Sequence, residues 1–335
     1  MFFTIPADTV VSFPLVFKPN EHVTQDNFLE AISTEKEKLR ECLAKAGAIH
    51  FSGFKQSLES FDPFMETLFW DREPFNPMLP GIFSGGRNLL AHNVVETTYL
   101  DKKLPMAMHN EFAYLSSYPS YICFRCLKAP ASGGETAIAD FRKVFEEIDP
   151  SIRKRFETEN VKYIRNLYSR RWLSELINRF IKIDESWMEV FGTNIKADVE
   201  KICDQHQLKY SWRKNDCLHI ENTLPATRLH PSTGETVWFN IAANMLKHSK
   251  HNGWIAQVIS QLIYPTTSSV PGYSTYGDGT NISSEDASHI RAVIDRNTIN
   301  VKWSEGDTLI CDNYLSAHTR LPYTGERSLA GAMRC

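Results

Sequence analysis

The chain has 335 residues, a length that fits one large domain or two ordinary ones. Its 42% hydrophobic and 23% charged residues are normal for a globular protein and exclude a disordered or fibrous one. The formal net charge is −3, with acidic and basic residues mixed along the chain, so nucleic acid is not an expected partner.

The sequence contains no run of about 18 consecutive apolar residues, which is what a membrane-spanning helix needs. The beginning of the chain is apolar in patches, but it lacks a basic segment, and Asp8 and two prolines interrupt it. A secretory signal peptide combines a basic start with a continuous apolar stretch. We therefore expect a cytoplasmic protein without a membrane partner.

Hydrophobic periodicity predicts the order of elements along the chain. Residues 26–48 have the spacing of an amphipathic helix that Gly47 ends, and residues 48–51 follow as a short strand. Two strand-like runs then flank residues 116–119. Further strands are predicted at 121–127, 236–239, 307–311 and 327–333.

The long region between these strands, residues 141–208, has helical character. Its clearest apolar stripe at helical spacing consists of Trp172, Leu173, Leu176, Ile177 and Phe180. No low-complexity linker or internal repeat divides the chain. We predict a single domain, residues 1–335, that is mainly β with helices and carries a lid-like helical insertion at about 141–208.

The seven cysteines are an odd number and widely spread, which indicates reduced thiols. Cys123 and Cys126 have the spacing of a zinc or redox pair. However, they lie in a predicted strand, where residues three apart point to opposite faces, and no second pair completes four ligands. Buried structural cysteines are the favoured interpretation.

Phosphate-binding, dinucleotide-binding and hydrolase motifs are absent, which leaves the histidines and acids to be examined. A His-x-Glu triplet on a strand places both side chains on one face, so a strand can offer two metal ligands. A third ligand would complete a 2-His-1-carboxylate site with open iron positions. Two such triplets occur, His109-Asn-Glu111 and His219-Ile-Glu221, and spacing alone does not separate them.

The context of the first triplet carries a resemblance. It is followed by Ser-Gly-Gly-Glu-Thr at 132–136, and the tail reads Asp-Asn at 312–313, His318-Thr-Arg320 and Gly-Glu-Arg at 325–327. With further matches at 47–54, 187–193, 230–240, 276–279 and 303–307, the chain resembles the Fe(II)/2-oxoglutarate oxygenases of the TauD/TfdA family, nearest to their syringomycin-hydroxylase-like branch. The resemblance implies a double-stranded β-helix, or jelly-roll, core.

The resemblance also assigns residues. It places His109, Glu111 and His318 at the three iron ligands, and it places Thr136 and Arg327 at the distal carboxylate of 2-oxoglutarate. The planar guanidinium fork of an arginine suits a carboxylate. The alternative to this assignment is a surface ion pair for Arg327 and an ordinary turn residue for Thr136.

Other positions bear on the substrate. Trp238, Asn240 and Arg320 are expected near the substrate pocket. Taurine dioxygenase carries a substrate-binding arginine at the place of Gly331, so a sulfonate substrate is not expected. The carboxylate of Glu111 argues against halogenase chemistry.

The resemblance therefore implies an enzyme that uses Fe(II), 2-oxoglutarate and O₂ to hydroxylate or desaturate an amino-acid-like or peptide-derived small molecule, free or carrier-bound, in natural-product biosynthesis. The same ligands serve hydroxylation, desaturation and ring formation, so these outcomes stay open, as does the oligomeric state. A non-catalytic jelly-roll binding protein and a protein-modifying hydroxylase are the alternatives.

Overall fold

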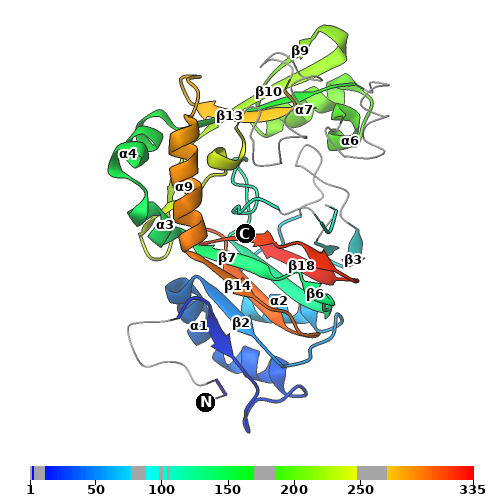
Figure 1. Ribbon diagram of the computed structural model, residues 1–335. Helices are drawn as coiled ribbons and strands as arrows, with labels where there is room; N and C mark the ends of the chain where they lie inside the picture. Colours follow the sequence, from blue (N-terminus) through cyan, green and yellow to red (C-terminus); the bar gives the residue numbers. More distant parts are fainter. Residues whose placement is uncertain are drawn as a thin grey trace.

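The computed structural model describes residues 2–3, 12–76, 88–97, 101–103, 106–169, 186–246 and 270–335 (Figure 1). Two β-sheets stacked face to face form the core, and helices cover their outer faces. Within the described ranges, no helix combines the length and the apolar character needed to cross a membrane.

Helix α1 (Phe28–Ala46) shows how local sequence sets the first elements. Its apolar side chains, Ile32 and Leu39 among them, are buried against the core. The helix ends at Gly47, which has φ +80° and donates its N–H to the Leu43 carbonyl at 2.7 Å. Glycine adopts this left-handed conformation without steric cost. Strand β2 (Ala48–Phe51) follows directly, so both predicted elements are confirmed.

The larger sheet has seven strands and is covered on its outer face by α1 and by α2 (Phe61–Leu68). The strands lie in the order β1 (Leu15–Phe17), β2, β15 (Thr308–Asp312), β5 (Tyr121–Lys128), β18 (Ser328–Arg334), β4 (Val94–Glu96) and β3 (Leu89–Ala91). Three of its members match the predicted strands at 121–127, 307–311 and 327–333. Because β5 lies inside the sheet, its side chains are buried on both faces.

The two cysteines of β5 show this alternation directly. Cys123 packs with the side chains of the helix-covered face, whereas Cys126 packs with those between the sheets. Both thiols are buried, and burial raises the pKa of each to about 12. The expectation that the pair does not form a joint metal or redox site therefore agrees with its geometry.

The smaller sheet has three strands, β14 (Thr298–Val301), β7 (Thr136–Asp140) and β16 (Ser316–Arg320), in that order. Its inner face packs on the larger sheet through residues such as Ile138 and Phe124. Its outer face is covered by α3 (Phe141–Glu147) and α9 (Ser284–Arg296). This arrangement confirms the predicted jelly-roll core with helices.

The region predicted to be a helical insertion, 141–208, is only partly helical. It begins with α3 and α4 (Pro150–Glu159) and ends with α6 (Trp187–Phe191) and α7 (Lys196–Gln205), but Val161–Leu167 forms strand β8. The predicted stripe from Trp172 to Phe180 lies outside the described residues.

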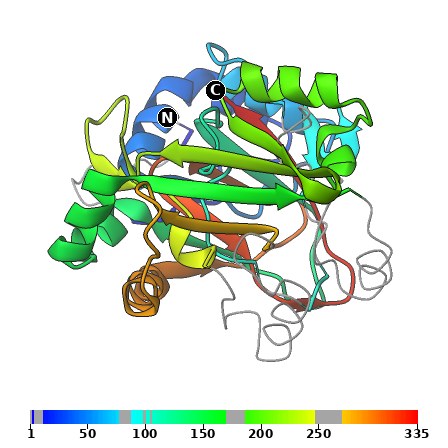
Figure 2. The ribbon, with the colours of Figure 1, turned by 90° about the horizontal axis from the view of Figure 1, so that it is seen from above.

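Strand β8 belongs to a separate four-stranded sheet with the order β13 (Gly272–Tyr276), β8, β10 (Cys217–Leu224) and β9 (Lys209–Arg213). Antiparallel neighbours on both sides satisfy its backbone, so pairing with distant segments outweighs the local helical pattern. Figure 2 shows the long strands of this sheet crossing above the core.

The remaining elements are short. They are the hairpin of β11 (Thr227–Leu229) and β12 (Thr236–Trp238), the pair β6 (Ser132–Gly133) and β17 (Tyr323–Thr324), and the 3₁₀ turns η1 (Lys214–Asp216) and η2 (Ala242–Asn244). The β6–β17 pair brings the Gly-Gly segment beside the chain that leads into β18.

Candidate metal centre

Two histidines from distant parts of the chain meet between the core sheets. His318 lies on β16, opposite Ile138 of β7. His109 lies in an isolated β-bridge with His318, in which each main chain donates its N–H to the carbonyl of the other at 3.1 and 2.9 Å. The ring centroids are 4.6 Å apart, and the ring of Phe124 on the facing sheet lies 5.1 Å from that of His318.

Glu111 lies in a turn rather than on the regular strand that the His-x-Glu argument assumed. The residue that follows, Phe112, has φ +56°, which ends the extended conformation. Asn313 holds this turn: its Oδ1 accepts the Glu111 N–H at 2.7 Å, and its Nδ2 donates to the Glu111 carbonyl at 3.0 Å and to the Pro119 carbonyl at 2.8 Å. Hydrogen bonds from Asn313, and not the periodicity of a strand, therefore orient the Glu111 side chain toward the two histidines.

The three side chains converge on one point. The Oε2 atom of Glu111 lies 3.7 Å from His109 Nε2 and 3.4 Å from His318 Nε2, and one ligand atom from each residue lies within 4.8 Å of the others. In the part of the chain that the structure describes, no other group of three His, Cys, Asp or Glu side chains meets this limit.

The tautomer of His109 favours metal binding. Its Nδ1 lies 2.8 Å from the carbonyl oxygen of Ala107. A carbonyl only accepts, so Nδ1 carries a hydrogen, and Nε2 is the ring nitrogen that faces Glu111 and His318 and could bind a metal. Two imidazole nitrogens and a carboxylate, with the first imidazole oriented by a carbonyl, fit a bound divalent iron.

The two residues expected at the 2-oxoglutarate carboxylate lie together at the same cavity. Arg327 donates through Nε to the Gly134 carbonyl at 2.9 Å and through Nη2 to Thr136 Oγ1 at 3.4 Å. Burial, with the nearby charge of Arg320, lowers the pKa of Arg327 to about 10. A buried cation of this kind is stabilised by an anionic ligand.

Gly134 makes this position of Arg327 possible. Its φ is +70°, and a Cβ added there would lie 3.1 Å from Arg327 Cδ, 2.8 Å from Pro130 Cγ and 3.0 Å from Tyr323 Cβ. The space beside the arginine stem is therefore available only to a residue without a side chain.

A single cavity joins the three converging ligands to this arginine. Its wall combines these polar residues with apolar side chains from the larger sheet. The described residues that line it are Thr97, Met106, His109, Glu111, Ile122, Phe124, Thr136, His318, Thr319, Arg320, Arg327, Leu329 and Met333.

Of the three residues expected near the substrate pocket, only Arg320 lines this cavity. Trp238 is buried elsewhere, with its ring 5.0 Å from that of Phe156. Asn240 uses its side chain to bind the Ala226 carbonyl at 2.8 Å and the Ala242 N–H at 3.1 Å. Neither residue is among the described residues that line the cavity, and the contacts printed for their side chains lie with the chain around β12.

The second triplet lies on β10 and its members bind each other. His219 Nε2 lies 3.0 Å from Glu221 Oε1, and His219 Nδ1 lies 2.8 Å from Asn166 Oδ1. Both side chains lie on one face, as strand periodicity requires, yet both ring nitrogens already have partners. Burial lowers the pKa of His219.

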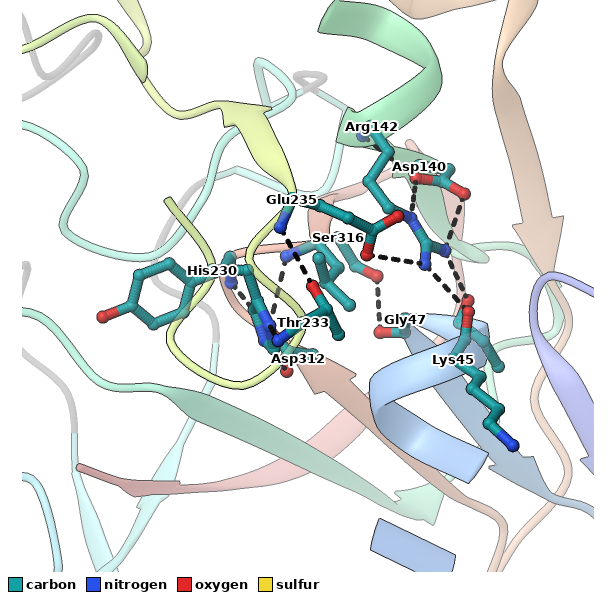
Figure 3. Close-up of polar contacts among 12 residues, drawn as sticks. Lys45, Gly47, Asp140, Arg142, His230, Thr233, Glu235, Asp312 and Ser316 are labelled. Atoms are coloured by element: carbon teal, nitrogen blue, oxygen red, sulfur yellow. Dashed lines mark hydrogen bonds and ion pairs between the residues drawn. The ribbon is translucent and has the colours of Figure 1, made fainter. Parts of the chain in front are cut away.

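A polar network that the sequence analysis did not single out supports the turn before β16 (Figure 3). Asp312 binds His230 Nε2 at 3.0 Å through Oδ2, and its Oδ1 accepts the N–H groups of Tyr314 and Leu315. Ser316 Oγ donates to the Gly47 carbonyl at 2.6 Å.

Asp312 directly precedes Asn313, so this network positions the residue that holds Glu111. In the sequence, Asp312 and Asn313 form the Asp-Asn pair of the tail motif, and Trp303 begins the matching segment 303–307. In the structure, Trp303 Nε1 donates to Thr136 Oγ1 at 3.1 Å. Neither residue type suggested the contact by itself.

Comparison with known proteins agrees with this geometry. A family model described as "Taurine catabolism dioxygenase TauD, TfdA family" matches residues 12–333. The chain is 29% identical over 296 residues to the dapdiamide synthesis protein DdaC of Enterobacter agglomerans, covering 88% of this chain and 83% of that protein. It is 26% identical over 336 residues to a clavaminate synthase-like protein of Arabidopsis thaliana, covering 98% and 93%.

Solved structures share the fold at lower identity. A taurine dioxygenase from Burkholderia xenovorans has a TM-score of 0.51 at 14% identity, covering 95% of this chain and 85% of that one. The PvcB protein from Pseudomonas aeruginosa has a TM-score of 0.52 at 12% identity, covering 97% and 85%.

Proposed function

The chain belongs to the TauD/TfdA family of Fe(II)- and 2-oxoglutarate-dependent dioxygenases, and we propose that it oxidises an amino-acid-like or peptide-derived small molecule. The observation that carries the site assignment is the cavity in which two histidines and a glutamate face the same space as Thr136 and Arg327. A ligand with two carboxylates could contact both ends.

His109, Glu111 and His318 are the residues that we assign to Fe(II). This donor set leaves positions for a chelating 2-oxo acid and for O₂. When bound, the metal couples the decarboxylation of 2-oxoglutarate, which gives succinate and CO₂, to the oxidation of the substrate by O₂. The protein residues hold the ligands in place and exclude water.

Thr136 and Arg327 are the residues that we assign to the distal carboxylate of 2-oxoglutarate. The guanidinium has no acidic partner among the described residues, and it is held by Gly134. A bidentate contact with a carboxylate satisfies such a cation. Ile122, Leu329 and Met333 add apolar surface to the wall of the same cavity, and a charged contact is stronger beside apolar surface than in water.

Two observations support the class of substrate. The relative from Enterobacter is named for dapdiamide synthesis and the plant relative for its likeness to clavaminate synthase, which favours a role in natural-product biosynthesis. In addition, a Cβ at Gly331 would lie 2.6 Å from Thr97 Cγ2, so an arginine for a sulfonate could not enter at this position without moving Thr97.

The test is a substrate screen under air with Fe(II) and 2-oxoglutarate, which measures succinate together with product mass. The panel contains free amino acids, carrier-bound amino acids, short peptides, a folded protein and taurine, and Glu111→Ala serves as the inactive control. We expect substrate-dependent succinate, with a mass gain of one oxygen for hydroxylation or a loss of two hydrogens for desaturation.

Turnover with taurine alone would overturn the assigned substrate class. Turnover of a folded protein only would favour a protein-modifying hydroxylase. Binding of 2-oxoglutarate without succinate formation across the panel would favour a non-catalytic binding protein.

A further inference from the structure

The hydroxyl group of Thr136 receives two hydrogen bonds. Trp303 Nε1 donates to Thr136 Oγ1 at 3.1 Å, and Arg327 Nη2 donates to the same atom at 3.4 Å. An indole N–H and a guanidinium N–H are donors only. Neither can reverse its role, so Thr136 Oγ1 is the acceptor in both contacts.

These two contacts decide where the hydroxyl hydrogen points. A threonine hydroxyl has two acceptor lone pairs and one hydrogen, and here both lone pairs are engaged. Among the described residues, no acceptor is placed to receive that hydrogen from Thr136, whose side chain is buried and lines the cavity. The hydrogen is therefore available to an acceptor in the cavity, which favours an anion there over a donor group.

Trp303 is placed for this role by the register of the smaller sheet. Val301, the last residue of β14, pairs with Thr136 of β7. Trp303 lies two residues further along, and side chains two apart in an extended chain lie on one face. The ring is buried and is contacted edge-on by His50, with the ring centroids 6.1 Å apart.

We propose that Trp303 is a positioning residue: its indole N–H fixes the Thr136 hydroxyl as a hydrogen donor toward the distal carboxylate of 2-oxoglutarate. The inference rests on the proposed assignment of Thr136 and Arg327 to that carboxylate. It adds a third residue that contacts no ligand itself and yet makes the cavity selective for a 2-oxo acid with a second carboxylate.

The test removes the N–H and keeps an aromatic ring. We expect Trp303→Phe to weaken 2-oxoglutarate binding to the anaerobic Fe(II) protein by about 2- to 12-fold, the range of one net hydrogen bond. Binding of 2-oxobutyrate, which lacks the distal carboxylate, should not change. The matched control is Trp212→Phe, since Trp212 Nε1 donates to Glu200 at 2.7 Å in another sheet.

Calorimetry gives both affinities, and their ratio is the decisive quantity. A general loss of stability lowers both affinities and leaves the ratio unchanged, so a poorly folding variant does not mimic the expected result. An unchanged ratio for Trp303→Phe would overturn the proposal.

A double-mutant cycle separates action through Thr136 from simple packing. In a Thr136→Val background, Trp303→Phe should cause no further loss of 2-oxoglutarate affinity, whereas in a Thr136→Ser background, which keeps the hydroxyl, the loss should return. Equal losses in all backgrounds would show that Trp303 acts by packing and would overturn the proposal.

The same data distinguish a failure of the role proposed for Trp303 from a failure of the assignment of Thr136 and Arg327 to the distal carboxylate. If Arg327→Met and Thr136→Val both leave 2-oxoglutarate binding unchanged, the proposed carboxylate site is wrong. If both weaken binding and Trp303→Phe does not, only the role of Trp303 is wrong.

Discussion

The main chains of His109 and His318 hold each other in place, since each peptide N–H donates to the carbonyl of the other at 3.1 and 2.9 Å. The bridge lies outside any regular strand on the His109 side. Because the bridge uses backbone atoms only, the spacing of the two main chains does not depend on either imidazole. A substitution at one histidine therefore leaves the other in position.

This bridge makes His109→Ala a clean test of the metal ligands. We expect the variant to keep its fold, to lose Fe(II) after desalting and to form no succinate, because one of three protein ligands is missing. Circular dichroism and metal analysis measure these outcomes.

The control for this test is His219→Ala. His219 binds Asn166 and Glu221 on β10, so the variant should retain iron and activity. Loss of iron in the His219 variant with retention in the His109 variant would reverse the assignment. Equal loss in both would indicate that His219 orients a ligand.

Asn313 should matter for both stability and metal affinity. Asn313→Ala removes three hydrogen bonds, including both that hold the backbone of Glu111, and each buried group left without a partner costs about 1–3 kcal/mol. We expect a lower free energy of unfolding and weaker Fe(II) binding, measured by chemical unfolding and anaerobic metal titration.

Asn240→Ala is the matched control for this prediction, since Asn240 is also buried and binds two backbone groups of residues that are not among the cavity lining. It should lower stability and leave metal affinity unchanged. Equal metal affinity in the two variants would mean that Asn313 contributes to folding alone.

Gly134→Ala should weaken the binding of 2-oxoglutarate. The new Cβ would lie 3.1 Å from Arg327 Cδ and would displace the guanidinium from the Gly134 carbonyl. The displaced guanidinium would lose a hydrogen bond to the distal carboxylate of 2-oxoglutarate. Loss of a hydrogen bond to a charged group corresponds to about a 10- to 100-fold increase in the KM for 2-oxoglutarate. Steady-state kinetics with varied 2-oxoglutarate measures this change.

Gly192→Ala controls for backbone strain. Gly192 has φ +65°, close to the +70° of Gly134, but no atom lies within 4 Å of a Cβ at that position. The strain of a left-handed alanine is thus shared, and only the Gly134 variant crowds Arg327. A similar KM in both variants would argue against a role of Arg327 in binding 2-oxoglutarate.

The cysteines should react as buried thiols. Cys335 is exposed and the other six are buried, so a thiol reagent at pH 8 should label one site rapidly in the native protein and seven after unfolding. The pKa of about 12 at Cys123 and Cys126 keeps these two thiols protonated at that pH. Rapid native labelling of more than one site, or release of tightly bound zinc on chelation, would contradict this prediction.

The sequence by itself determined the elements whose signals are local. The glycine at position 47 ends α1, and the alternation in β5 separates Cys123 from Cys126, because both depend on backbone geometry within a few residues. Motif order also brought forward His109 and His318, which the structure places 4.6 Å apart between ring centroids.

Tertiary structure decided everything that depends on contacts between distant segments. Val161–Leu167 became a strand because β10 and β13 pair with it on both sides. Glu111 faces the histidines because Asn313 holds its backbone, and Trp303 reaches Thr136 because β14 and β7 are in register. Trp238 and Asn240 have their contacts around β12 for the same kind of reason. A side-chain hydrogen bond depends on angstrom-level placement of two segments, and that placement follows from how the whole chain packs, which no single stretch of sequence encodes.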